Sequence, residues 1–148
     1  GILAGLVVIT PAAGVVNVAG ALVLSMLASL VCYLAVILKS RLGYDDSLDV
    51  FGIHGVAAML GAIGLSFLLR APTVADFVAK DPAWTTWKQL GVQAASVAIA
   101  AGYAALASII LLVIVDKLVG FRLDTSREMA GMDHALHGES GYGLLSLD

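Results

Sequence analysis

The chain has 148 residues, of which 60% are hydrophobic and 13% are charged, and its formal net charge at pH 7 is -3. Few water-soluble domains cover so much apolar side chain, so the composition indicates a membrane protein. The small acidic charge and the lack of a basic cluster argue against a nucleic-acid partner. The single cysteine, Cys32, permits neither an internal disulfide nor a thiolate metal site.

The first apolar segment, residues 1–13, is too short to cross a hydrocarbon core, which takes about 20 helical residues. It starts at Gly1 inside hydrophobic sequence, without an initiator methionine or the charged flank of a signal peptide. We therefore expect the chain to be a piece of a longer protein and this segment to be the end of a helix. Pro11 is expected to kink or stop that helix.

Three longer apolar segments follow, at residues 18–38, 49–69 and 87–119, and each is long enough to cross a membrane. As an ideal helix the last would extend for about 50 Å, so we expect it to tilt strongly, bend or project. The connections between the segments are polar and rich in turn-forming residues. The predicted fold is an all-α, polytopic membrane helical bundle over residues 1–120, followed by a tail at residues 121–148.

Basic residues are divided unequally between the two ends of these helices. One side carries Lys39, Arg41, Lys117, Arg122 and Arg127, and the other carries Arg70, Lys80 and Lys88. Because lysine and arginine accumulate on the cytoplasmic side of membrane proteins, we place the C-terminus in the cytoplasm.

The tail is polar, and its sequence TSRE at residues 125–128 predicts a capping box and a short helix that ends near Gly131. His134 and His137 lie three residues apart in the same tail. This pattern is a weak signal for a metal site, because a His-x-x-His spacing in a polar tail is common in proteins that bind no metal. We predict no metal and no other cofactor.

His54 is an ionisable residue inside the segment at residues 49–69. Such a residue is costly in a membrane and generally faces a bundle interior or an aqueous path. At helical spacing it shares a face with Ala57 or Ala58 and with Gly61, and this face suits either close helix packing or a narrow channel. A packing role and a pore role both remain open. In a pore, a neutral imidazole offers one donor and one acceptor and can pass a proton.

Three aspartates, Asp45, Asp46 and Asp49, stand at the start of the same helix. Negative charge favours the positive end of a helix dipole, and Asp46 can cap the helix together with Asp49, three residues further on. The alternative is that Asp46 or Asp49 orients partner groups at the cytoplasmic mouth of a pore.

Two long motifs, DDSLDVFGIHGV at residues 45–56 and GFRLDTSREMAGMDHALHGESGY at residues 120–142, strongly resemble the C-terminal part of the ammonium transporter (Amt/Mep/Rh) family. The sequence GLVVITPAAGVV at residues 5–16 is similar to that family's helix ending in a Thr-Pro-Ala turn. The resemblance implies a fold of eleven membrane helices built from an inverted repeat and assembled as a trimer with one pore per subunit. This chain would supply about the last four helices.

The resemblance also implies roles for individual residues. His54 matches the second of the family's paired pore histidines, which line a narrow hydrophobic conduit, and Asp46 resembles the family's aspartate near that helix start. The tail pattern, which braces one subunit's tail against the pore helices of the next, is matched by Gly131, Asp133, His137, Gly138, Glu139 and Tyr142. This tail favours the Amt branch over Rhesus-type proteins. Ala135 stands where plant members carry a phosphorylated threonine, so that switch is not expected here.

The expected function is therefore that of a multi-pass channel or transporter in the cell or plasma membrane, without enzymatic activity. It would move ammonium or ammonia through a histidine-lined hydrophobic pore. The first pore histidine and the phenylalanine gate would belong to the missing half. The implied partners are ammonium or ammonia, membrane lipid, two further copies in a homotrimer and a PII-type regulatory protein. The alternatives are an ammonium sensor of the same family and a structural subunit of a larger membrane complex.

Overall fold

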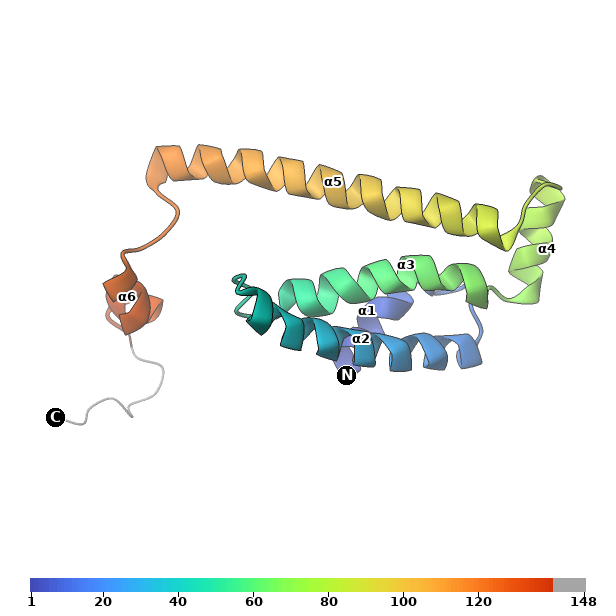
Figure 1. The fold of residues 1–148 in the computed structure, drawn as a ribbon, viewed down its shortest axis with the longest axis horizontal. Coiled ribbons are helices and arrows are strands. Elements are labelled where there is room, and N and C mark those ends of the chain that lie inside the picture. Colours follow the sequence, from blue (N-terminus) through green and yellow to red (C-terminus); the bar gives the residue numbers. More distant parts are fainter. Residues whose placement is uncertain (140–148) are drawn as a thin grey trace. The chain divides into compact units, whose positions relative to one another are not determined.

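The computed structural model describes residues 1–139. Within this range the regular elements are helices (Figure 1), and an isolated β-bridge joins Val16 to Leu69. The chain divides into two compact units, Gly1–Gly102 and Tyr103–Asp148. The predicted all-α fold is confirmed for the described residues.

The first helix, α1 (Ile2–Ile9), passes directly into the 3-10 turn η1 (Thr10–Ala12). Pro11 lies in this turn, and it has no backbone N–H with which to continue an α-helix. The hydroxyl of Thr10 donates a 3.0 Å hydrogen bond to the carbonyl of Leu6, which holds the turn against the helix end. Pro11 therefore stops the helix instead of kinking it, and the chain leaves η1 through a turn at residues 13–15.

The second helix, α2 (Val18–Leu42), begins at Asn17, whose side-chain oxygen accepts a 2.8 Å hydrogen bond from a backbone amide of the first turn. It ends at Gly43, which has the left-handed conformation typical of a helix C-terminus. The helix therefore continues beyond the predicted end at residue 38 and includes Lys39 and Arg41. Both cations lie in the last turn, where they complement the negative end of the helix dipole.

Residues 49–69 form two successive kinds of helix instead of one. The five-residue π-helix η2 (Phe51–Gly55) comes first, and α3 (Val56–Leu68) continues from it. A π-helix is built on i→i+5 hydrogen bonds and frequently occurs at functional sites. Just before it, Asp49 has a positive φ of 55°, which is uncommon for a residue with a side chain.

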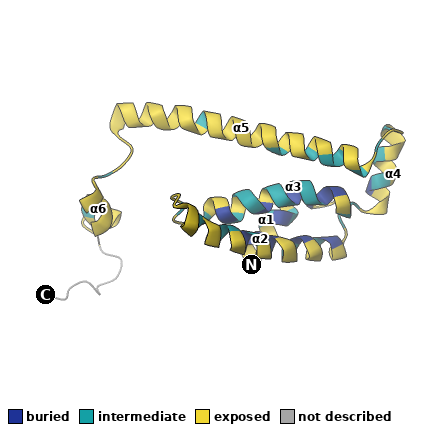
Figure 2. Cartoon of the chain, viewed as in Figure 1, coloured by how far each residue is buried: buried dark blue, intermediate teal, exposed yellow. Residues whose placement is uncertain are grey.

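The connection that was expected to consist of turns contains a further helix, α4 (Ala71–Lys80). Pro72 lies in its first turn, where an N–H is not needed for helix formation. The last long helix, α5 (Thr86–Val119), has 34 residues, close to the predicted range of 87–119. None of its residues is buried (Figure 2), so its apolar side chains are available to lipid or to further protein.

The core lies where α1, α2 and α3 contact one another, with α2 and α3 running antiparallel (Figure 1). Buried residues recur at four-residue intervals on each helix: Ala4, Val8 and Ala12, then Gly20, Leu24, Ala28 and Cys32, then Ala57, Gly61 and Leu65. This interval keeps them on one side of each helix. Most of them are small, so the backbones can approach closely.

At Gly61, α3 lies directly against the backbone at the end of α1. A Cβ atom on this residue would lie 2.1 Å from the carbonyl oxygen of Val8 and 2.9 Å from Cγ of Pro11. A Cβ atom on Gly64 would meet only the end of the Leu24 side chain, at 2.7 Å. Residues of α3 therefore pack directly on the backbone where α1 ends, and only glycine fits at Gly61.

In the second unit, the predicted tail helix is present as α6 (Thr125–Ala130). The predicted capping box is wrong, because the residue before the helix is Asp124 and its side chain makes no capping hydrogen bond. The side chain of Glu128 instead accepts a 2.5 Å hydrogen bond from Arg122.

A second short helix, α7 (Met132–His137), follows at once. Gly131 separates the two helices with a φ of 92°, and Gly138 ends α7 with a φ of 67°. Side chains disfavour both conformations, so glycine has a backbone reason to occupy these two positions of the tail motif.

Candidate functional site

His54 lies in the π-helix η2, and its side chain is exposed on the described chain. The buried side of this helix passes through Gly52, Ala57 and Gly61, so the step across the π-turn is five residues and the next step is four. The prediction that His54 shares a face with Ala57 and Gly61 is therefore wrong. The π-turn holds an additional residue, which rotates His54 away from the buried side. Ala58, the alternative neighbour, is exposed like His54.

Asp46 caps the start of this π-helix with both carboxylate oxygens. Its Oδ1 accepts a 2.8 Å hydrogen bond from the amide of Val50, and its Oδ2 accepts bonds of 3.1 and 3.2 Å from the amides of Phe51 and Gly52. These are backbone donors that a helix N-terminus leaves without helical partners. Asp46 thus fixes the first turn of the segment that carries the histidine.

The charge of Asp46 is stabilised by the same contacts. Desolvation at this half-buried position raises the pKa of the carboxyl group, but the three amide hydrogen bonds and the nearby Lys39 ammonium lower it by more. The net pKa lies below the ordinary value of an aspartate. The cap is therefore ionised at neutral pH.

Asp49 does not cap the helix with Asp46, and that part of the prediction is wrong. Its carboxylate forms an ion pair with Lys39 near the end of α2. The same ammonium group donates a 2.7 Å hydrogen bond to the backbone carbonyl of Asp46. A count of basic residues by membrane side does not show this role of Lys39. The signal that was present in the sequence is its position at the C-terminal end of a helix that precedes an acidic turn.

The helix α2 also contacts the π-helix itself. The thiol of Cys32 is 3.6 Å from the carbonyl oxygen of Ile53, to which it donates a hydrogen bond. One turn further along α2, the side chain of Val36 lies against Gly52, whose Cβ position would be 3.1 Å from Cγ2 of Val36. One side of α2 therefore supports the π-helix from Cys32 to Lys39.

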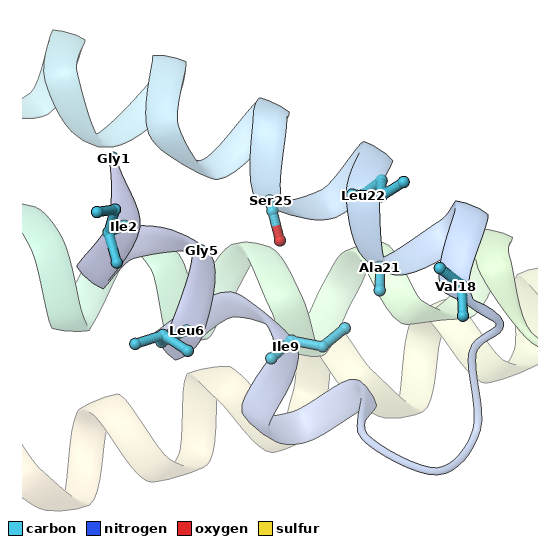
Figure 3. A pocket seen from close by; sticks show the side chains of 9 residues that line it. All are labelled: Gly1, Ile2, Gly5, Leu6, Ile9, Val18, Ala21, Leu22 and Ser25. Atoms are coloured by element: carbon cyan, nitrogen blue, oxygen red, sulfur yellow. The ribbon is translucent and has the colours of Figure 1, made fainter.

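An apolar groove of about 530 Å³ lies between α1 and α2, and His54 is not among its lining residues (Figure 3). Ser25 supplies the polar side chain among its lining residues, which are Gly1, Ile2, Gly5, Leu6, Ile9, Val18, Ala21, Leu22 and Ser25. Such a surface suits apolar packing and offers little to a small polar solute. We therefore place the candidate site at His54.

The predicted tail residues belong to the second unit. Gly131, Asp133, His137, Gly138 and Glu139 lie in or beside α7, and Tyr142 lies outside the described residues. The amide of Glu139 donates a 3.3 Å hydrogen bond to the carbonyl of Asp133, which closes the end of α7. Across residues 1–139, no group of three or more histidine, cysteine or acidic side chains is placed to hold a metal ion.

Three helical stretches are long and apolar enough to cross a membrane within the described range: Val18–Leu42, Phe51–Leu68 and Thr86–Val119. One of them carries the ionisable side chain of His54 at a π-turn, and the carboxylate of Asp46 caps that turn. These features define a polytopic, helical membrane protein with a polar site inside a span.

The sequence model described as the Ammonium Transporter Family matches residues 1–142, and the chain belongs to this family. It is 42% identical over 147 residues to an ammonium transporter of Mycobacterium tuberculosis. The aligned region covers 96% of this chain and 31% of that protein. It is 39% identical over 145 residues to an ammonium transporter of Aquifex aeolicus, with coverage of 97% and 33%. It is 37% identical over 145 residues to ammonium transporter Amt1 of Archaeoglobus fulgidus, with coverage of 96% and 36%.

The resemblance to the ammonium transporter family is confirmed by these matches. These relatives are ammonium transporters, and the chain is an integral membrane protein by its family and its apolar helices. It spans about a third of the length of the relatives it matches.

Proposed function

We propose that the chain is the C-terminal portion of an ammonium transporter, in which His54 lines a hydrophobic pore for ammonium or ammonia. The observation that carries this proposal is the placement of His54. It lies in a membrane-spanning segment of an ammonium transporter family member, on a capped π-turn, and its side chain points away from the packed side of the helix.

The chemistry of imidazole suits this role. In its neutral form it has one donor and one acceptor nitrogen, so it can bind an uncharged solute without adding a charge barrier. It can also take up or release a proton near neutral pH, which allows it to relay a proton beside the solute. Asp46 supports this function by holding the first turn of the π-helix, and Asp49 supports it through its ion pair with Lys39.

The rest of the pore belongs to the remainder of the protein, since the relatives are about three times as long as this chain. We propose a homotrimer with one pore per subunit and a cytoplasmic C-terminus, for which the distribution of basic residues is the support. The tail motif around α7 would brace the neighbouring subunit. A PII-type protein is the proposed regulatory partner, at the same membrane face.

The test is His54→Ala in the full-length protein, reconstituted in vesicles. We expect ammonium or methylammonium flux to fall by at least about tenfold, or its coupling to charge to be lost, because both solute binding and proton relay depend on the ring. Tyr103→Ala is the control, since it removes an exposed aromatic ring from α5, outside the candidate site and the tail motif.

Unchanged flux together with unchanged electrogenicity in His54→Ala would overturn the pore role. Ammonium binding by the wild-type protein without measurable flux would overturn transport and favour a sensor of the same family.

A further inference from the structure

We propose that Lys39 is a positioning residue for His54, acting through the turn at residues 46–49 that precedes the π-helix. This inference rests on the proposed pore role of His54. It adds a residue on a different helix, α2, to the groups on which transport depends.

Lys39 holds both ends of this turn. Its ammonium group donates a 2.7 Å hydrogen bond to the backbone carbonyl of Asp46 at the start of the turn and pairs with the carboxylate of Asp49 at its end. The amide of Asp49 donates a 2.9 Å hydrogen bond to the same carbonyl of Asp46, which closes the turn. The Lys39 side chain is 18% exposed and that of Asp49 is 32% exposed, so both groups are partly shielded from water.

The turn needs such a clamp because of the backbone at Asp49. A φ of 55° is sparsely populated by residues with a side chain and persists when surrounding contacts hold it. The ion pair with Lys39 is the contact that holds the Asp49 side chain, and it comes from outside the turn. Loss of the ammonium group would therefore allow Asp49 to relax toward negative φ.

Both ends of the clamped turn bond directly to the segment that contains the histidine. The carboxylate of Asp46 accepts from the amides of Val50, Phe51 and Gly52, and the carbonyl of Asp49 accepts a 2.9 Å hydrogen bond from the amide of Ile53. Every backbone amide from residue 50 to residue 53 is thus tied to the turn. A change of the turn would shift the π-helix and re-aim the next residue, His54.

The experiment compares Lys39→Met, Lys39→Arg and Arg41→Met in the full-length protein, reconstituted in vesicles. Arg41 is the matched control, because it is an exposed cation in the same last turn of α2, and its removal changes the cytoplasmic charge equally. We expect Lys39→Met to lower the maximal flux by a few-fold to about a hundredfold, the range of coupling between contacting residues. The half-saturating concentration should stay within about twofold. Lys39→Arg should restore most of the flux, and Arg41→Met should stay within about twofold of wild type.

A second comparison separates positioning from a general structural role. If Lys39 acts through His54, then Lys39→Met should cause little further loss when it is added to His54→Ala. Independent, multiplicative losses would overturn the proposal, as would wild-type flux in Lys39→Met or an equal loss in Arg41→Met.

If Lys39→Met does not assemble, the milder Asp49→Asn removes the same ion pair while keeping the shape of the side chain. Asp49→Asn should also lower the maximal flux, and wild-type flux in this variant would overturn the proposal.

The results distinguish failure of the pore role from failure of the positioning role. An inert His54→Ala overturns the pore role, whereas a loss of flux in His54→Ala with inert Lys39→Met and Asp49→Asn overturns the positioning role alone.

Discussion

At the scale of single residues, the carboxylate of Asp46 has the largest number of defined contacts at the candidate site. It accepts hydrogen bonds from three consecutive amides, those of Val50, Phe51 and Gly52, and the backbone carbonyl oxygen of the same residue accepts from Lys39. Helix capping by aspartate ordinarily stabilises only the end of its own helix. Here the capped turn leads directly into His54, so the cap fixes the short backbone segment that carries the functional side chain.

We expect Asp46→Asn in the full-length protein to increase hydrogen exchange at the three capped amides by about two- to thirtyfold, the range expected for loss of a cap. An asparagine side chain has a single acceptor oxygen and no charge, so it cannot satisfy the same three donors. Hydrogen-exchange mass spectrometry of the peptide that contains residues 50–52 measures the effect.

Asp45→Asn is the control for this change, since the Asp45 carboxylate accepts from the hydroxyl of Ser47 and the three amides keep their acceptor. Slow exchange of residues 50–52 in Asp46→Asn would contradict the cap.

Hydrogen exchange of the same peptide also measures how the stability of the cap depends on pH. Because the pKa of Asp46 is lowered in the folded chain, its stabilising effect is complete above the ordinary aspartate pKa of about 3.9 and is lost as the pH falls through the lower folded value.

At the scale of elements, the packing of α1 on α3 depends on the absence of a side chain at Gly61. The atom that blocks a Cβ there is a backbone oxygen, which cannot move unless α1 moves. At Gly64 the blocking atom is the end of a leucine side chain, which can rotate. The two glycines therefore differ in how much a methyl group should cost, although both lie on the same short helix.

We expect Gly61→Ala to destabilise the full-length protein by about 1–3 kcal/mol, as overpacking of a tight contact does, and Gly64→Ala to cost less. Gly91→Ala on α5 is the control, because nothing lies within 4 Å of its Cβ position. Thermal unfolding in detergent, followed by loss of helical signal, ranks the three variants. Equal melting temperatures for Gly61→Ala and Gly91→Ala would show that the contact with Val8 does not form.

At the scale of the whole molecule, the boundary between the two compact units lies within α5, after Gly102, so the second unit holds the last part of α5 together with the tail. The described part of the tail, residues 121–139, has internal order, because α6 and α7 contact each other and Arg122 bonds to Glu128. By the proposed function, the tail acts on a neighbouring subunit, which would account for so specific a sequence in a segment whose described residues are mostly exposed.

We expect deletion of residues 121–148 from the full-length protein to lower ammonium flux severalfold by uncoupling the subunits, while the membrane helices remain inserted. A shorter deletion of residues 143–148 keeps the motif through Tyr142 and serves as the control. Flux assays in vesicles with matched protein amounts make the comparison, and wild-type flux in the longer deletion would refute a coupling role for the tail.

The membrane class, the three long apolar helices and the family could be predicted from sequence, because they depend on the composition and order of residues within short segments. Apolar length decides whether a helix can cross a bilayer. A run such as DDSLDVFGIHGV is specific enough to indicate a family without any knowledge of contacts. His54 and Asp46 were found in the same way, since an ionisable residue in an apolar span and an acidic residue at a helix start are local signals.

The relations between residues on different helices were decided only by the tertiary structure. The π-turn changes which side of the helix His54 faces, and periodicity that assumes an α-helix cannot show this. The pairing of Lys39 with Asp49 and the contact of Gly61 with Val8 depend on how helices approach one another in space. Sequence alone thus determined which segments form long apolar helices and that they belong in a membrane, because these follow from local composition. The tertiary structure determined where the histidine points and what holds it, because those depend on packing between helices.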